Sequence, residues 1–279
     1  MGLENLGWII LGSAFRCRGV PAEVRPDLEA LLQGFPRAEG APDVDFEILR
    51  KEGGGLALKD GEGPLQDLGE PVSSHLEYQL INRAIERARD CWVLHAGAVA
   101  GPRGTCLLAG ESGAGKTSLT LWLWASGLPL VTDDLCPLLR ETLEAETFPR
   151  SLHMDCEYSP RLLEKIPPRP ASFPADYYPF PGPTGAPPPP ITDLLVIERG
   201  PRPEGEIQLL GQSEAAHHLL KAVIKGPAFE FGQALGDMLR LAGRVRAGRL
   251  RAATPEGAGE TALAWLRGDS HGLTRTSTD

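Results

Sequence analysis

The sequence predicts an α/β fold built around a phosphate-binding loop, and three neighbouring observations support that prediction. Residues 110–117 match the motif G-x-x-x-x-G-K-[ST]. The apolar run at 105–109 is typical of a buried strand, and the segment 117–126 is typical of a helix that ends at Gly127. The motif requires this order of strand, loop and helix, because the amino end of the helix then points at the phosphates.

Residues 1–90 are predicted to form a small N-terminal α/β part. Strands are expected at 8–11, 44–49 and 55–58, and a short helix at 27–32. Ser74 and Glu77 match a capping box, which predicts that a longer helix opens there. The apolar residues of that helix share one face, which indicates core packing: they are Leu80, Ile81, Ala84, Ile85 and Ala88.

Residues 91–267 are predicted to form the nucleotide-binding core, so that 1–267 is a single domain. One strand is expected at 92–99, and a turn at 101–104 connects it to the strand before the loop. Further strands are expected at 128–132, 143–148, 192–197 and 248–253, and further helices at 213–225, with Ser213 as its cap, at 229–244 and at 260–265. The tail at 268–279 is expected to be disordered.

The segment 160–190 contains twelve prolines interleaved with aromatic residues. Proline removes a backbone donor and fixes φ, so the segment predicts an irregular loop rather than a helix or strand. Two interpretations remain open for it: a plain surface excursion, or a lid that contacts the substrate, since long loops in compact domains are often functional.

Composition limits the classes of function. The net charge of −9 and the pI near 5.3 argue against a nucleic-acid-binding surface, which needs concentrated Lys and Arg. No apolar run approaches the roughly 18 residues that a membrane helix needs. The five cysteines, an odd number with no secretory signal, indicate a reducing cytosol: Cys17, Cys91, Cys106, Cys136 and Cys156. A cytoplasmic protein without nucleic-acid or membrane partners is therefore expected.

The loop itself predicts ATP and Mg²⁺ as ligands. Its backbone N–H groups can surround phosphate oxygens, Lys116 can reach the β- and γ-phosphates, and the Thr117 hydroxyl can hold Mg²⁺. The expected nucleotide-binding residues run from the loop into the helix: Gly110, Glu111, Ser112, Gly113, Ala114, Gly115, Lys116, Thr117 and Ser118.

Two further features favour phosphoryl transfer over nucleotide binding alone. Asp133 and Asp134 end a predicted strand seventeen residues after Lys116, where one carboxylate can serve Mg²⁺ and another can accept the proton of an attacking hydroxyl. His95 lies in the strand that precedes the loop strand, so sheet pairing would bring it to the phosphates or the metal. The alternatives are an Asp pair that only ends a turn and a histidine that is only packed in the core.

These segments carry a resemblance. The runs at 94–99, 107–117 and 130–134 read Leu-His-Ala-Gly-Ala-Val, then Leu-Leu-Ala-Gly-Glu-Ser-Gly-Ala-Gly-Lys-Thr, then Leu-Val-Thr-Asp-Asp. They resemble the kinase domain of HPr kinase/phosphorylase and are more distantly similar to ATP-dependent phosphoenolpyruvate carboxykinase. The resemblance is strongest over 92–136. The rest of the chain looks like short, single-domain relatives, among them kinases that phosphorylate a serine of a modified-peptide precursor.

The resemblance implies a mixed sheet and an ATP- and Mg²⁺-dependent kinase that phosphorylates a serine of a peptide or small protein. It implies that Lys116 binds the phosphates and Thr117 the metal, that His95 assists, and that the acidic pair is divided between base and metal partner. Asp133 is favoured as the base and Asp134 as the metal partner. A small-molecule kinase and a non-catalytic ATP-binding regulator are the alternatives, and homo-oligomerisation is left open.

Two departures from the family pattern are informative. Ser118 stands where HPr kinases usually have an acidic residue, and the segment 196–201 only loosely resembles their signature Leu-Glu-Val-Arg-Gly-Leu-Gly. They leave the reverse phosphorylase activity and HPr as acceptor without support. Arg150 and Arg199 are candidate contacts for the acceptor or a phosphate.

Overall fold

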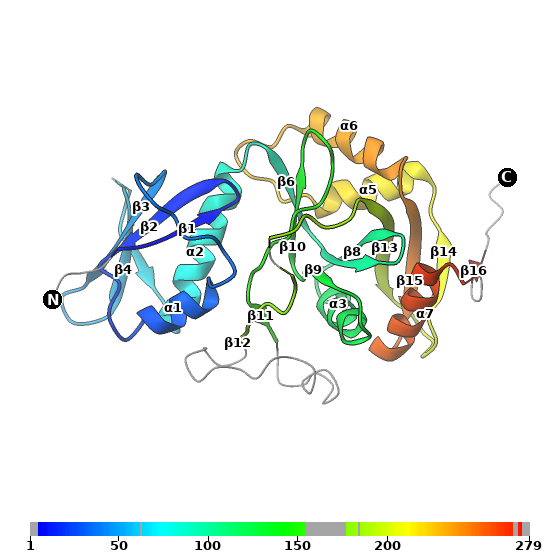
Figure 1. The fold of residues 1–279 in the computed structure, drawn as a ribbon, viewed down its shortest axis with the longest axis horizontal. Coiled ribbons are helices and arrows are strands. Elements are labelled where there is room, and N and C mark those ends of the chain that lie inside the picture. Colours follow the sequence, from blue (N-terminus) through cyan, green and yellow to red (C-terminus); the bar gives the residue numbers. More distant parts are fainter. Residues whose placement is uncertain (1–4, 62, 155–176, 184, 270–272, 275–279) are drawn as a thin grey trace.

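The structure, a computed structural model, describes residues 5–61, 63–154, 177–183, 185–269 and 273–274. This part of the chain is an α/β protein with six helices and mixed sheets (Figure 1). The N-terminal part carries one sheet with its two helices, and the remainder carries a larger sheet covered by helices on both faces (Figure 1).

The N-terminal sheet has five strands in the order β1-β2-β3-β4-β5. They are β1 (Leu6–Ile10), β2 (Ser13–Arg18), β3 (Val44–Arg50), β4 (Leu56–Asp60) and β5 (Gln66–Leu68). Helices α1 (Arg25–Leu31) and α2 (Val72–Arg87) cover this sheet, because its alternating apolar residues need a partner face. Trp8, Phe15, Leu28, Leu76 and Leu80 are buried together in this core. The strands predicted at 44–49 and 55–58 are confirmed as β3 and β4, which pair antiparallel.

The capping-box prediction is wrong. Helix α2 begins at Val72, two residues before Ser74, and no side chain caps it. Ser74 and Glu77 therefore lie within the helix, and Glu77 is free to contact another element. Ser213 is not a cap either, because α5 (Gln212–Ala222) begins after Gly211 without a side-chain cap.

The single strand expected at 92–99 is two strands in different sheets. Strand β6 (Cys91–His95) pairs with β10 (Leu135–Leu139), whereas β7 (Gly97–Gly101) pairs with β8 (Gly104–Gly110). The chain changes sheets next to Gly97, where a Cβ atom would lie 2.1 Å from the Thr120 hydroxyl. The strand expected at 143–148 is also wrong, since that segment makes only an isolated bridge to β10.

The large sheet is mixed, in the order β16-β14-β15-β13-β8-β7-β9. Its other strands are β9 (Leu130–Thr132), β13 (Ile191–Arg199), β14 (Glu206–Leu209), β15 (Arg246–Ala252) and β16 (Leu273–Thr274). Strands β8, β13 and β15 run parallel, and the hairpin partner β7 runs antiparallel to β8. Strand β16 lies in the tail that was expected to be disordered, and it pairs with β14.

Two pairs of helices cover the two faces of the large sheet. Helices α5 and α6 (Phe231–Ala242) pack on one face, and α3 (Lys116–Ala125) and α7 (Pro255–Arg267) pack on the other (Figure 1). Strand β8 serves both cores by simple alternation, since Leu107 faces the first pair and Leu108 the second. This three-layer packing buries β8 and fixes the place where it ends, at Gly110.

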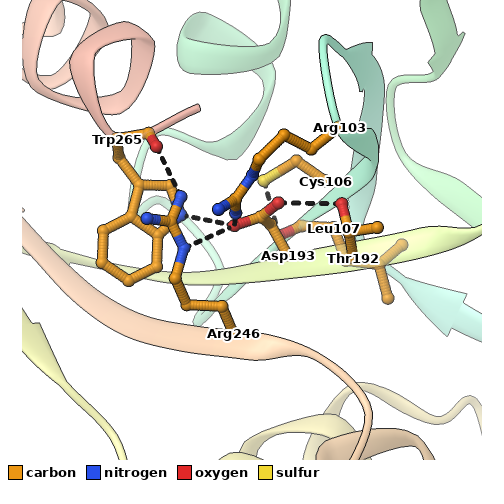
Figure 2. A network of polar contacts seen from close by, with 7 residues as sticks. All are labelled: Arg103, Cys106, Leu107, Thr192, Asp193, Arg246 and Trp265. Carbon is orange, nitrogen blue, oxygen red and sulfur yellow. Dashed lines mark hydrogen bonds and ion pairs between the residues drawn. The ribbon is translucent and has the colours of Figure 1, made fainter. Parts of the chain in front are cut away.

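A buried polar cluster fastens the far end of the large sheet (Figure 2). The Asp193 carboxylate accepts hydrogen bonds from Arg103 (2.6 Å), Arg246 (3.0 Å) and the Trp265 indole N–H (2.8 Å). Asp193 pairs with Cys106, four residues before the register position of Gly110. At about 3.3 Å per strand residue, this cluster lies roughly 13 Å along the strand from the loop and serves stability.

A two-residue ladder connects the proline-rich segment 160–190 to the chain before it, so this segment contains a short strand where only an irregular loop was predicted. Strand β11 (Leu152–His153) pairs with β12 (Tyr177–Tyr178). Within 160–190, residues 160–176 and residue 184 lie outside the described residues. Cys156 lies outside them as well. The four described cysteines are buried free thiols.

Candidate functional site

The glycine loop, residues 110–117, leaves the end of β8 and enters α3. Gly115 sits before the first helical residue with φ of 97°, a conformation that favours glycine. A Cβ atom on Gly110 would lie 2.7 Å from the Ile197 carbonyl oxygen, so the loop leaves the sheet against β13 with no room for a side chain. The predicted strand, loop and helix are therefore present in the order that the motif requires.

Lys116 is held inside the glycine loop. Its ammonium donates hydrogen bonds to the carbonyl oxygens of Gly110 (3.0 Å) and Glu111 (3.1 Å), and only 7% of the residue is exposed. Burial lowers the pKa of Lys116, and the negative charges of Asp134 and Asp133 offset part of that shift. A partly desolvated cation at this position attracts an anion strongly.

Asp133 is buried beside the first turn of α3. It is 9% exposed, and its Oδ1 atom has no hydrogen-bond partner among the described residues. Burial, and then the charge of Asp134, raise the pKa of Asp133 to about 7, although a hydrogen bond with Thr117 opposes the shift. A buried carboxylate oxygen without a partner is costly, so it marks a position suited to a metal, a proton or a ligand donor.

Asp134 differs from its neighbour because both of its oxygens have side-chain partners. His95 Nε2 lies 3.0 Å from Oδ1, and the Arg150 guanidinium donates to Oδ2 at 3.2 Å. Burial would raise the pKa of Asp134, but the hydrogen bond from His95 and the positive charges of His95, Arg150 and Lys116 bring it below its ordinary value. Two adjacent carboxyls thus have opposite shifts, which is a frequent feature of acid–base sites.

His95 reaches the acidic pair by a route that the sequence did not predict. It was expected next to the loop strand, but its own strand β6 pairs with β10 instead. In that ladder His95 stands opposite Leu135, the residue directly after Asp134. The register of β6 against β10 therefore brings the imidazole to the carboxylate.

Sequence reasoning missed Glu77. This side chain of α2 is completely buried and receives two hydrogen bonds from Arg150, at 2.7 and 3.1 Å. Burial lowers the pKa of Arg150, but Glu77 and then Asp134 raise it above its ordinary value, so the guanidinium stays charged. The spacing of Glu77 in the sequence signalled only a helix cap, so nothing in it indicated this contact.

Three hollows meet at the glycine loop. A cleft of about 840 Å³ lies between the loop, the end of β13 and α5, and its lining includes His95, Ser112, Glu198, Arg199, His218 and Lys221. A second hollow, of about 390 Å³, lies on the α7 side and includes Ser118 and Pro255. A third, of about 230 Å³, is lined by Thr117, Asp133, Asp134, Arg150, His153 and Tyr177. The structure thus brings every predicted site residue to one edge of the sheet.

The oxygen atoms at this edge fit a Mg²⁺ ion whose coordination shell is completed by substrate phosphates and water. Within the described ranges no three His, Cys, Asp or Glu side chains form a metal cluster by themselves. Mg²⁺ needs no such cluster, because it is commonly held by one or two carboxylates together with substrate phosphates and water. The unpartnered oxygen of Asp133 beside the Thr117 hydroxyl, with Asp134 adjacent, fits that pattern.

Comparison with known proteins does not assign a family. No family model matches the chain, and no curated protein matches it significantly. None of the helices in the described part combines the length and the apolar character needed to cross a bilayer.

Proposed function

We propose that the protein is an ATP- and Mg²⁺-dependent kinase of the HPr-kinase-like type, which transfers the γ-phosphoryl group to a serine hydroxyl of a peptide or small protein. The observation that carries the proposal is the convergence of Lys116, Thr117, Asp133, Asp134 and His95 at the mouth of the glycine loop. Phosphoryl transfer depends on positioning and charge neutralisation, which these groups supply.

The mixed sheet supports the resemblance that motivates this proposal. The resemblance implied a mixed sheet, and the large sheet is mixed, since β7 runs antiparallel to the loop strand β8. His95 and the Asp133-Asp134 pair both lie beside the glycine loop. The strand of His95, β6, pairs with β10 and not with the loop strand.

The two aspartates are proposed to have different roles, one as the general base and the other as a Mg²⁺ ligand. Asp133 would accept the hydroxyl proton, because it has an unbonded oxygen and a raised pKa, whereas the two Asp134 oxygens already contact His95 and Arg150. A base works best when its pKa lies near the working pH. Thr117 and Asp134 would hold Mg²⁺, which supplies charge neutralisation on the phosphates when bound.

The contact of Thr117 with Asp133 supports the reverse division, with Asp133 at the metal and Asp134 as base. The variants Asp133→Asn and Asp134→Asn distinguish the two. The metal partner's variant should raise the Mg²⁺ concentration needed for half-maximal rate, whereas the base's variant should lower the rate at saturating Mg²⁺.

A hydroxyl acceptor has room on the acidic side of the loop. The pocket of about 230 Å³ beside the aspartates is large enough to admit a serine side chain, and the cleft of about 840 Å³ on the other side of the loop adds further open space. The small pocket alone also supports the second candidate function, a kinase for a small hydroxyl compound such as free serine.

The test is transfer of radiolabelled phosphate from ATP, with Mg²⁺, to a serine-containing peptide library and, separately, to free serine. Asp133→Asn should lower turnover by about 10²–10⁴-fold and leave ATP binding largely intact. Lys116→Ala should abolish most transfer. Transfer that survives Lys116→Ala would refute the role of the loop, and ATP binding without transfer to any acceptor would favour a regulatory protein.

A further inference from the structure

The buried carboxylate of Glu77 connects the N-terminal part to the candidate site. Glu77 lies in α2 on the face that also buries Leu76 and Leu80, and none of its side chain is exposed. An ionised carboxylate in such a core needs a charged partner with several donors. Arg150 supplies it through Nε and Nη2, in a bidentate arrangement.

The remaining donors of Arg150 face the site. Its Nη1 atom lies 3.2 Å from Asp134 Oδ2, so one planar guanidinium joins two carboxylates from different parts of the chain. Only arginine can do this with fixed geometry, because its fork presents five N–H donors in one plane, whereas lysine has a single flexible ammonium. The orientation of Asp134 is therefore set by Glu77 on one side and by His95 on the other.

The segment around Arg150 is fastened to the N-terminal part at two further points. Phe148 packs edge-on against Phe35, with ring centroids 5.1 Å apart. The Ser151 hydroxyl donates to the carbonyl oxygen of Leu31 in α1, at 2.8 Å. These contacts flank Arg150 on both sides, so the N-terminal part fixes the backbone as well as the side chain.

We infer that the N-terminal α/β part is an integral component of the catalytic unit, and that Glu77 and Arg150 are positioning residues that hold Asp134 toward Mg²⁺-bound nucleotide. The inference rests on the proposed function. Glu77 itself touches neither the loop nor the aspartates in the described contacts; it acts through Arg150.

The test separates positioning from folding by measuring ligand-induced stabilisation in the full-length protein. The rise in melting temperature is recorded with ATP in EDTA and with ATP plus Mg²⁺, alongside phosphate transfer to the serine peptide library. The variants are Glu77→Gln, Arg150→Gln and Arg150→Lys. The control is Arg246→Lys, which weakens the buried Asp193 cluster at the other end of the strand.

Glu77→Gln and Arg150→Gln should keep the rise produced by ATP without metal and lose most of the additional rise produced by Mg²⁺. Turnover should fall by about 10–100-fold, as is typical for residues that orient a metal ligand, with KM for ATP nearly unchanged. Arg150→Lys should not restore either quantity. The double variant should be no worse than Arg150→Gln, because both act through one contact. Arg246→Lys should lower the melting temperature of the ligand-free protein. It should retain both the rise produced by ATP without metal and the additional rise produced by Mg²⁺.

The inference is overturned if Glu77→Gln behaves like the control, with a lower melting temperature but a normal Mg²⁺ increment and normal turnover. Full restoration by Arg150→Lys would also overturn it, since any cation would then suffice. If Glu77→Gln does not fold, Arg150→Lys decides alone. A wild-type protein that is not stabilised by ATP at all would instead refute the proposed function, and with it this inference.

Discussion

Replacing Asp133 by asparagine should stabilise the ligand-free protein at neutral pH. Asp133 is buried next to Asp134, and these two causes raise its pKa from 3.8 to about 7. Its ionised form is therefore less favourable in the folded protein than in the unfolded chain. An asparagine side chain has nearly the same shape and no charge, so the variant escapes this cost.

The sign and size follow from proton linkage. Below pH 3.8 both states are protonated and Asp133 imposes no cost. Between pH 3.8 and about 7 the unfolded chain loses the proton first, so wild-type stability falls as pH rises. The difference between the two pKa values corresponds to roughly 4 kcal/mol above pH 7, at about 1.4 kcal/mol per pH unit.

The assay is urea unfolding of wild type and Asp133→Asn in EDTA without nucleotide, from about pH 4 to about pH 8. The stability difference in favour of the variant should grow across this range and level off above pH 7. The measured quantity is the change of this stability difference with pH, so any pH-independent effect of the asparagine amide on stability cancels. Asp45→Asn is the control of opposite sign, since the hydrogen bond from Arg16 holds the pKa of Asp45 below its ordinary value. A difference that does not change with pH would refute the burial argument for Asp133.

Three further outcomes are expected. The rate of phosphate transfer should rise with pH and reach a plateau above about 7, because the proposed base must lose its proton; a plateau already reached near pH 5 would exclude Asp133 as that base. Asp193→Asn should lower the unfolding free energy by about 3–5 kcal/mol in urea while ATP-induced stabilisation persists, since it leaves Arg246 without its buried partner; a loss under about 1 kcal/mol would contradict the role of this cluster. Gly259→Ala should lower the unfolding free energy by about 1–3 kcal/mol, because its Cβ would lie 2.2 Å from the Trp122 ring. The matched control Gly236→Ala has open space and should be neutral or slightly stabilising; equal effects of the two substitutions would contradict the packing at Gly259.

The glycine loop was predictable because its information is local. Strand, loop and helix occupy consecutive residues, and the spacing from Gly110 to Thr117 specifies the backbone without reference to the rest of the chain. The strand that ends at Thr132 was predictable for the same reason, and it delivers Asp133 and Asp134 to the loop. The apolar run along β8 likewise indicated a buried strand.

Predictions failed where a short signal competed with packing. Ser74 and Glu77 have capping-box spacing, but the apolar face of α2 extends to Val72, so the helix begins earlier and Glu77 turns inward. The apolar run at 92–99 gave no sign of its division into β6 and β7, because both halves are hydrophobic. The division places His95 opposite Leu135, which no local pattern encodes.

The sequence by itself determined the chemistry available to this protein: a lysine, a hydroxyl, two carboxylates and an imidazole near a glycine loop. The tertiary structure decided how the carboxylates differ, because burial acts on Asp133 while His95 and Arg150 act on Asp134. It also decided that Glu77, 73 residues before Arg150, belongs to the same network. The physical reason is range: a loop conformation depends on neighbours in the chain, whereas a pKa and an ion pair depend on which distant side chains share a buried space.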